Sequence, residues 1–197
     1  MRRPVIATAL LALPLSLIGL AAPAEAGTRA TCAGLRATIV VTGHSPHVVR
    51  GTNRRDVIKV LAAGHLVDGR GGNDLICGSR GRDVLRGGAG HDVILGAAGV
   101  DLINGGAGND RILGAEGNDV EHGGPGRDYL SGGPGNDRLD GDAGDDRLLG
   151  GAGDDSLTGD AGTDQVDGGE GADDLQHGED DEVTIDEQDD DQPCDDD

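Results

Sequence analysis

Aspartate recurs every nine residues along most of this chain, and carboxylates at a fixed spacing are candidate ligands for a hard metal ion. The repeated phrase is clearest in GGAGHDVIL (residues 87–95), GGAGNDRIL (105–113) and GGPGNDRLD (132–140), and fourteen copies keep one frame through residues 51–176. The sixth position is an aspartate in every copy except the second, which has His65. The thirteen candidate ligands are Asp56, Asp74, Asp83, Asp92, Asp101, Asp110, Asp119, Asp128, Asp137, Asp146, Asp155, Asp164 and Asp173.

The other positions of the phrase predict the backbone that holds these aspartates. Glycines before the aspartate favour a tight turn, because glycine takes positive φ without steric cost. The three residues after it place an apolar residue between mixed neighbours, as in a short strand whose eighth position points inward. One apolar residue per copy cannot form a core alone, so the copies must stack as a solenoid. We therefore expect an all-β fold with two copies in each coil.

Stacking would bring the aspartates into two columns, because residues eighteen apart would lie above one another at the strand spacing of about 4.8 Å. Carboxylates at that distance repel, and no basic residue of the repeat is placed to neutralise them. A cation between successive turns would remove the repulsion, and Ca²⁺ prefers oxygen ligands such as carboxylates and turn carbonyls. The lack of clustered Cys or His argues against zinc or copper in these turns. A metal-free β-solenoid is the alternative, and the two carboxylate columns count against it.

The phrase resembles GGxGxDxUx, the calcium-binding nonapeptide of the RTX family, also called hemolysin-type repeats. The resemblance covers residues 51–176 and implies a right-handed parallel β-roll, with ions held in the turns by the aspartates and by backbone carbonyls. Carried over by position, the ligands are the thirteen aspartates above, with Asp56 the weakest match because Arg54 replaces its glycine. Neighbouring pairs leave six gaps in one column and five in the other, which sets a ceiling of eleven Ca²⁺ ions.

Two copies depart from the family pattern. The second copy, VLAAGHLVD (residues 60–68), lacks three of the glycines and has His65 in place of the carboxylate, so it should form a coil without binding an ion. The eighth copy has Glu121 at the inward eighth position. Burial of an uncompensated charge there is expensive and would raise the pKa of Glu121. We expect a local twist at this copy, or a reorientation that lets Glu121 reach solvent or metal.

The first 26 residues have the pattern of a secretory signal peptide, with a basic start, an apolar segment and an Ala24-Glu25-Ala26 cleavage site. The apolar segment is interrupted by Pro14 and is too short to span a membrane. Adjacent Arg2 and Arg3 leave export by the twin-arginine route as an alternative. The sequence thus predicts a secreted, extracellular protein that is cleaved after Ala26 and has no membrane span.

Residues 27–50 should cap the N-terminal end of the roll. They contain a strand run at residues 38–41, and residues 42–50 keep the nine-residue frame in degraded form, as expected of a terminal repeat. The start TCAGLRATIV resembles stand-alone secreted members of the calcium-repeat family. His44 and His47 in this segment could be a metal pair, but a polar loop around Pro46 is the favoured interpretation.

Three cysteines in an exported chain suggest one disulfide and one residue left over. We expect Cys32 to pair with Cys77, because that bond would attach the cap to the third copy, where Cys77 is at the outward ninth position. Such a loop closure would stabilise the fold by about 4 kcal/mol in the chain-entropy model. Cys194 would then be free or would pair between chains.

Charge and composition indicate that folding depends on the ion. The formal net charge is −21, and the last segment, residues 177–197, has no Lys or Arg and reads as an acidic tail without fixed structure, with a capping strand possible near Val183. The chain lacks Phe and Trp, so the core is one thin file of Leu, Ile and Val. Such a core cannot outweigh chain entropy and self-repulsion, so calcium binding should supply the folding free energy.

The sequence therefore predicts a secreted calcium-binding repeat protein that is not an enzyme. It contains no H-E-x-x-H, G-x-S-x-G or P-loop motif, and its negative charge argues against nucleic-acid binding. The first alternative is an adhesin or scaffold with a cell-wall or matrix partner, in which calcium is only structural. The second is an enzyme that uses outward groups such as Arg111, Tyr129 and Arg138, and no paired acid and base supports it.

Overall fold

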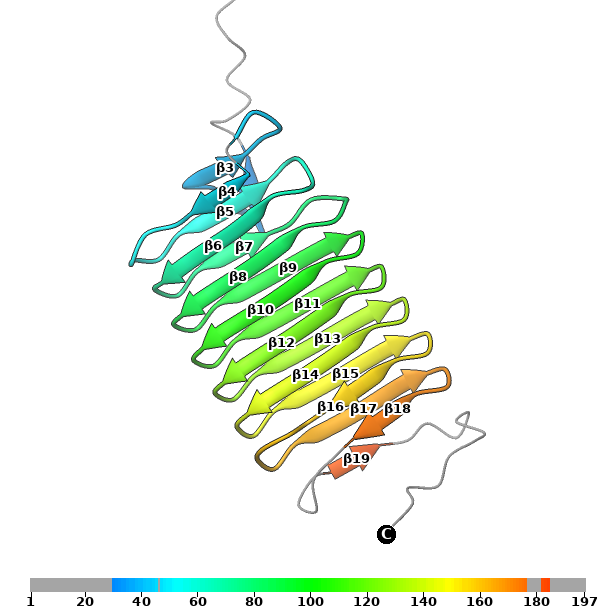
Figure 1. The fold of residues 1–197 in the computed structure, drawn as a ribbon. Coiled ribbons are helices and arrows are strands. Elements are labelled where there is room, and N and C mark those ends of the chain that lie inside the picture. The colour runs from blue at the N-terminus through cyan, green and yellow to red at the C-terminus, as the bar shows by residue number, and fades with distance from the viewer. Residues whose placement is uncertain (1–29, 46, 177–181, 185–197) are drawn as a thin grey trace, which may run out of the picture.

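The computed structural model describes residues 30–45, 47–176 and 182–184, and every regular element within them is a β-strand (Figure 1). The nine-stranded sheet consists of β3 (Ile39–Val41), β5 (Val57–Val60), β7 (Leu75–Cys77), β9 (Val93–Ala98), β11 (Arg111–Glu116), β13 (Tyr129–Pro134), β15 (Arg147–Ala152), β17 (Gln165–Glu170) and β19 (Glu182–Thr184). The eight-stranded sheet consists of β4 (Val48–Arg50), β6 (Leu66–Gly71), β8 (Val84–Ala89), β10 (Leu102–Ala107), β12 (Val120–Pro125), β14 (Arg138–Ala143), β16 (Ser156–Thr158) and β18 (Asp174–Gln176).

Successive strands alternate between the two sheets, so two nonapeptides make one coil of a parallel β-solenoid (Figure 1). Residues eighteen apart are register partners, as in Ile94 with Ile112 and Leu139 with Leu157. The predicted coil of two copies is therefore confirmed. The predicted signal peptide, Cys194 and the acidic tail other than residues 182–184 lie outside the described residues.

The core is a single file of eighth-position side chains from both sheets. Its members from Ile58 to Leu157 have exposed fractions of 0 %, and Ile39, the register partner of Ile58, extends the file at the N-terminal end. The first-position Val60 and its partner Val41 are also buried in this core.

The residues on either side of the eighth positions face outward and are mostly more exposed, whereas Val57, Leu75 and Cys77 are buried in a separate cluster with Cys32. The alternation expected from the sequence is therefore confirmed along the described strands.

The strands are longer than the three residues that the sequence predicted. Most of them continue through the first three positions of the next copy, as in β9, so that the tight turn contains only positions four to six. The glycine at the first position points inward, where a Cβ atom would collide with the aspartate of its own copy. Glycine is therefore needed at this position to make room inside the strand, as well as in the turn.

The turns of the third copy and of the fifth to fourteenth copies have left-handed backbone at the second and fourth positions. Gly117 at a fourth position has φ of 140°, and a Cβ atom there would overlap the carbonyl oxygen of Gly99 on the preceding coil. At the second position the left-handed conformation is imposed even on residues with side chains, including Ala97, Asp142 and Asp160, with φ of 91°, 68° and 66°. Stacking thus overrides the ordinary backbone preference of these residues.

The N-terminal residues add a first coil and a hairpin that is attached to the roll by a disulfide. β3 pairs with β5, and β4 pairs with β6, so residues 39–41 and 48–50 begin both sheets. The antiparallel hairpin β1 (Thr31–Cys32) and β2 (Leu35–Arg36) lies over the outer face of β5 and β7, where a disulfide joins Cys32 to Cys77. At the other end β19 pairs with β17, close to the capping strand considered from the sequence.

The described part of the chain contains no helix with the length and apolar character needed to cross a membrane.

We predict that Gly117→Ala destabilises the solenoid more than Gly64→Ala. Both glycines have positive φ, so either substitution should cost about 1–2 kcal/mol of backbone strain. Only the Cβ atom at Gly117 meets the backbone of another coil, which should add about 1–3 kcal/mol. Urea unfolding of both variants at one fixed calcium concentration measures the difference, and equal losses of stability would contradict the packing argument.

Candidate metal centre

Each of the thirteen predicted aspartates follows a turn and precedes a strand. The column that begins at Asp56 leads into the nine-stranded sheet, and the column that contains Asp83 leads into the eight-stranded sheet. Twelve of the side chains have exposed fractions of 6 % or less, and Asp173 near the C-terminal end is half-buried. The structure therefore gathers the predicted carboxylates into the two columns expected from the sequence.

One oxygen of each stacked carboxylate is held by the backbone. Oδ1 of Asp110 accepts a hydrogen bond of 2.7 Å from the N–H of Asp92, one coil earlier. Eleven bonds of this kind, each 2.7–2.8 Å long, connect the columns within the described residues. They fix the orientation of the carboxylates, so the second oxygen of each one points the same way along the column.

That second oxygen is buried and accepts no hydrogen bond in nine successive members of the columns. They are Asp74, Asp92, Asp101, Asp110, Asp119, Asp128, Asp137, Asp146 and Asp155, all through Oδ2. A buried acceptor without a donor costs about 1–3 kcal/mol, and more when it is charged. The same unsatisfied oxygen in nine turns indicates that a cation binds there and compensates the buried carboxylates.

A backbone carbonyl shares the space into which this oxygen points. A Cβ atom placed on Gly141 would lie 2.7 Å from Oδ2 of Asp146 and 2.9 Å from the carbonyl oxygen of Gly159. At Gly96 the corresponding distances are 2.8 Å to Oδ2 of Asp101 and 2.7 Å to the carbonyl oxygen of Gly114. Two acceptor oxygens that face one small space suit a cation, and an all-oxygen donor set suits Ca²⁺.

The first members of the columns differ from the rest. Oδ2 of Asp56 accepts hydrogen bonds from the backbone N–H and the hydroxyl of Thr52, at 2.7 and 2.9 Å. Ser79 donates to Oδ2 of Asp83 in the same way, with both bonds 2.8 Å long. Sequence reasoning missed these two hydroxyls, although a Ser or Thr four residues before the aspartate is a readable signal. Asp56 has donors to both oxygens and therefore needs a cation less than the later members, whereas Oδ1 of Asp83 is buried and accepts no hydrogen bond.

Histidine begins the second column. Nδ1 of His65 lies 2.9 Å from the carbonyl oxygen of Ala62, and the His65 ring centroid is 6.3 Å from that of His47. The degraded copy before the repeats therefore keeps the frame, with His47 at the position equivalent to His65. The second copy forms a coil, as predicted, and its lack of an ion stays a prediction.

Burial raises the pKa of the stacked carboxylates when no cation is present. Desolvation is the main cause, the hydrogen bond from the neighbouring backbone N–H opposes it, and the next carboxylates in the column add to it. The pKa values reach about 6 for Asp74, Asp92 and Asp137, and about 7 for Asp101, Asp128, Asp146 and Asp155. The fold therefore disfavours ionised columns unless a cation compensates them.

Basic side chains do not supply this compensation among the described residues. The arginine ion pairs of this part of the chain lie on the outer surface and connect Arg50 with Asp68 and Arg127 with Asp145. The turns can therefore hold Ca²⁺ through the free carboxylate oxygen, with turn carbonyls as further ligands. The bound ion would supply the positive charge that cancels the repulsion between stacked carboxylates.

The prediction of a twist or solvent exposure at Glu121 is wrong. Glu121 is 0 % exposed, and β12 stays in register with β10 and β14, where Ile103 and Leu139 are its partners. Desolvation, with the carboxylates of Asp119 and Asp137, raises the pKa of Glu121 to about 8. The sheet fixes the backbone on both sides, so the chain keeps its coil and the side chain is favoured in its protonated form.

The carboxyl group of Glu121 lies on the side of the core that faces Asp119. A Cβ atom on Gly114 would meet an oxygen of both side chains. The amides of Gly114 and Ser131 lower the pKa of Glu121 slightly, although neither makes a well-formed hydrogen bond with its oxygens. Contact between Glu121 and a metal ion, the remaining alternative from the sequence, stays a prediction.

The outward residues considered for catalysis do not form one site. The guanidinium of Arg111 lies over the ring of Tyr129, 4.2 Å from its centroid, across β11 and β13. Arg138 belongs to β14 in the other sheet. Arg111 and Tyr129 thus form a cation–π pair on neighbouring strands, and this interaction explains their proximity without a catalytic role.

Comparison with known proteins supports this description of the turns. The family model described as RTX calcium-binding nonapeptide repeat matches the chain four times, at residues 68–103, 86–121, 122–157 and 140–175. The matches together extend over residues 68–175, which include twelve of the thirteen aspartates and every turn with an unsatisfied Oδ2. No curated protein matches the chain.

We predict that acid stabilises the metal-free solenoid. The folded-state pKa of seven column aspartates is raised from 3.8 to about 6 or 7, so the folded chain binds more protons than the unfolded chain between these values. The stability is therefore fully present below about pH 4 and is lost as the pH rises through 6 to 7. Far-ultraviolet circular dichroism of protein dialysed free of metal should show β-structure increasing as the pH falls.

The calcium-loaded protein is the control for this titration. It should show the opposite trend, because protons compete with Ca²⁺ for the same carboxylates. A metal-free chain that loses β-structure on mild acidification would contradict the desolvation argument.

We predict that Glu121→Leu stabilises the solenoid by about 1–3 kcal/mol near neutral pH, because it removes a buried carboxyl without hydrogen bonds. The gain should grow as the pH rises from about 4.5 to about 8, because over that range the wild-type folded state must retain a proton that the unfolded state has released. Urea unfolding at fixed calcium measures both effects. The matched control is Glu116→Leu at an exposed position of the same copy, which should give no such gain.

Proposed function

This chain belongs to the RTX calcium-binding nonapeptide repeat family, and we propose on that basis that it is a secreted, non-enzymatic calcium-binding protein. Its β-roll would fold when several Ca²⁺ ions bind between stacked Gly-Asp turns. Repeats of this family bind Ca²⁺ and typically have calcium-binding and structural roles. The thirteen sixth-position aspartates are the proposed ligands, with Asp56 the weakest because Thr52 and Thr38 already donate to its two oxygens.

The observation that carries the proposal is the buried Oδ2 of nine column aspartates between Asp74 and Asp155, Asp83 excepted, which accepts no hydrogen bond and faces a glycine carbonyl. Ca²⁺ binds such oxygens at about 2.3–2.6 Å. An ion between two coils would take one ligand set from each of them. Each interior aspartate would then serve two neighbouring sites, which favours cooperative binding.

Folding that depends on calcium is expected because the hydrophobic core is small and the negative charges of the chain repel one another. The core is one file of aliphatic side chains, and the chain carries a formal net charge of −21. Burial raises the pKa of seven column aspartates to about 6 or 7, so forming the roll at neutral pH works against their ionisation. Bound Ca²⁺ would remove this penalty and add its binding free energy to the folded state alone.

Secretion is supported by the sequence pattern of residues 1–26 and by the disulfide between Cys32 and Cys77, a bond typical of oxidising compartments. Extracellular calcium modules bind at about 10⁻⁴ to 10⁻³ M, so the chain would fold after export into a calcium-rich medium. The disulfide would hold the N-terminal hairpin over the first coils and define the end from which stacking starts.

We predict that Ca²⁺ converts the metal-free chain cooperatively from disorder to β-structure at neutral pH, and that Mg²⁺ does not. Asp155→Asn should raise the calcium midpoint by at least about 10-fold and lower the number of bound ions, because it removes a ligand from two adjacent gaps. Circular dichroism and equilibrium dialysis on the same samples measure both quantities.

The matched control is Asp154→Asn, the same charge change at an exposed neighbour. It should leave the midpoint and the ion count nearly unchanged. Equal effects of the two substitutions would show that net charge, and not ligation at the sixth position, drives the transition. A β-structured spectrum without any metal at neutral pH would refute folding on calcium.

A further inference from the structure

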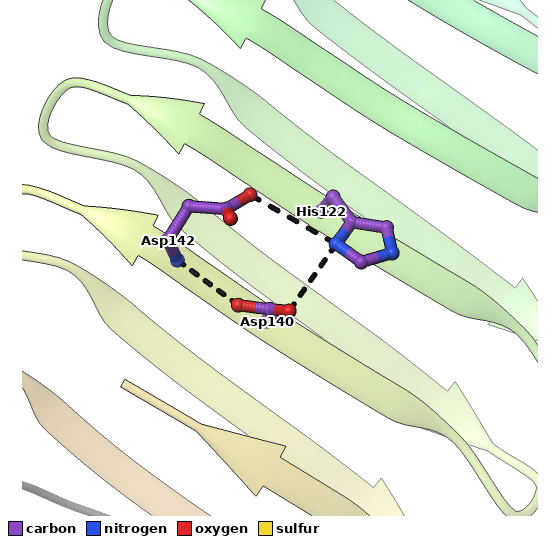
Figure 2. A group of neighbouring side chains, drawn as sticks. All are labelled: His122, Asp140 and Asp142. Atoms are coloured by element: carbon purple, nitrogen blue, oxygen red, sulfur yellow. Dashed lines mark hydrogen bonds and ion pairs between the residues drawn. The ribbon is translucent and has the colours of Figure 1, made fainter. Parts of the chain in front are cut away.

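The outer face of the eight-stranded sheet carries a second group of metal-ligating side chains, away from the calcium turns. Position nine of one copy and position two of the next both point outward there, because the inward first position lies between them. These positions hold His122 on β12, and Asp140 and Asp142 on β14. All three side chains are half-buried, and a donor atom from each converges on one point (Figure 2).

The distances between these donors fit one small cation. Nδ1 of His122 lies 3.3 Å from Oδ2 of Asp140 and 3.8 Å from Oδ2 of Asp142, and the three donors all lie within 4.8 Å of one another (Figure 2). Two ligands at about 2.1 Å from a tetrahedral Zn²⁺ ion are about 3.4 Å apart. The histidine distances are therefore already close to those of a coordinated ion.

Backbone geometry holds the group in place. His122 and Asp140 are register partners on adjacent strands, and Gly124 and Asp142 are the next pair on the same face. The N–H of Asp142 donates to Oδ1 of Asp140 at 3.2 Å, which leaves Oδ2 of Asp140 directed at the imidazole (Figure 2). Sites built on paired strands keep their ligands in position better than sites on loops.

The charge around the group favours a cation. Asp160, one coil beyond Asp142, lines the same hollow as Asp142 and adds a third carboxylate to this part of the outer face. This open hollow is also lined by Gly106 and Gly124 and leaves room for water or another ligand.

We propose that His122, Asp140 and Asp142 bind one divalent transition-metal ion of the Zn²⁺ type on the outer face of the roll. The imidazole nitrogen determines the class of ion, because Ca²⁺ takes oxygen ligands whereas Zn²⁺ binds histidine nitrogen together with carboxylate oxygen. The site would join β12 to β14 across the outside, at the coil where Glu121 interrupts the apolar core. It is separate from the turns and does not depend on how many of them hold calcium.

Zinc titration of the untagged chain in excess Ca²⁺, followed by calorimetry, tests the proposal. We expect wild-type protein to bind one Zn²⁺ at this site, and His122→Ala and Asp140→Asn each to weaken that binding by at least about 10-fold. Co²⁺ in place of Zn²⁺ should give visible absorption bands of a low-symmetry complex in wild type, and these bands should be lost in both variants.

Two matched controls exclude non-specific binding. His91→Ala removes an exposed histidine in a turn, and Asp167→Asn removes a ninth-position aspartate in the other sheet, so both should bind Zn²⁺ like wild type. Circular dichroism in Ca²⁺ checks that every variant folds. Absence of zinc binding in calcium-loaded wild type would overturn the proposal and leave a plain imidazole–carboxylate ion pair. Zinc binding that persists in His122→Ala and Asp140→Asn would also overturn it.

Discussion

The structure depends on one constraint, the stacking of buried carboxylates at the strand spacing of about 4.8 Å. A sheet ladder fixes that spacing, so the aspartates cannot move apart to relieve their repulsion. The fold satisfies one oxygen of each carboxylate with a backbone N–H, as Asp92 does for Asp110, and leaves the other directed at a glycine carbonyl. Oxygen ligands, charge and spacing are then all set for a divalent ion, and the rest of the coil serves to repeat this arrangement.

The same stacking explains which departures from the repeat are tolerated. Asp142 and Asp160 adopt left-handed backbone that normally favours glycine, and Glu121 stays inside a file of aliphatic side chains without breaking register. Each residue is held by neighbours on two sides, so local strain is offset by the hydrogen bonds of adjacent coils. The first-position glycines do not tolerate a side chain in the same way, because the space for their Cβ atoms is occupied by aspartate and carbonyl oxygens.

Outward positions are free of this constraint, so their side chains differ from copy to copy. On the nine-stranded sheet they hold the disulfide that attaches the N-terminal hairpin through Cys77, and the pair of Arg111 with Tyr129. On the eight-stranded sheet they hold His122, Asp140 and Asp142 in register. A scaffold that aligns every eighteenth residue can build a cross-strand site from single substitutions, because position nine and position two always return to the same face.

The sequence by itself determined the period, the two aspartate columns and the inward eighth position. These follow from spacing, because a fixed nine-residue frame places residues eighteen apart in contact whatever their identity. Tertiary structure alone decided the length of the strands, the burial of Glu121 and the cluster at His122. Those features arise between coils, where backbone hydrogen bonds in the sheet outweigh the local preference of a glutamate or an aspartate. A pattern read along one copy contains no information about that balance, because the competing interactions come from the coils on either side.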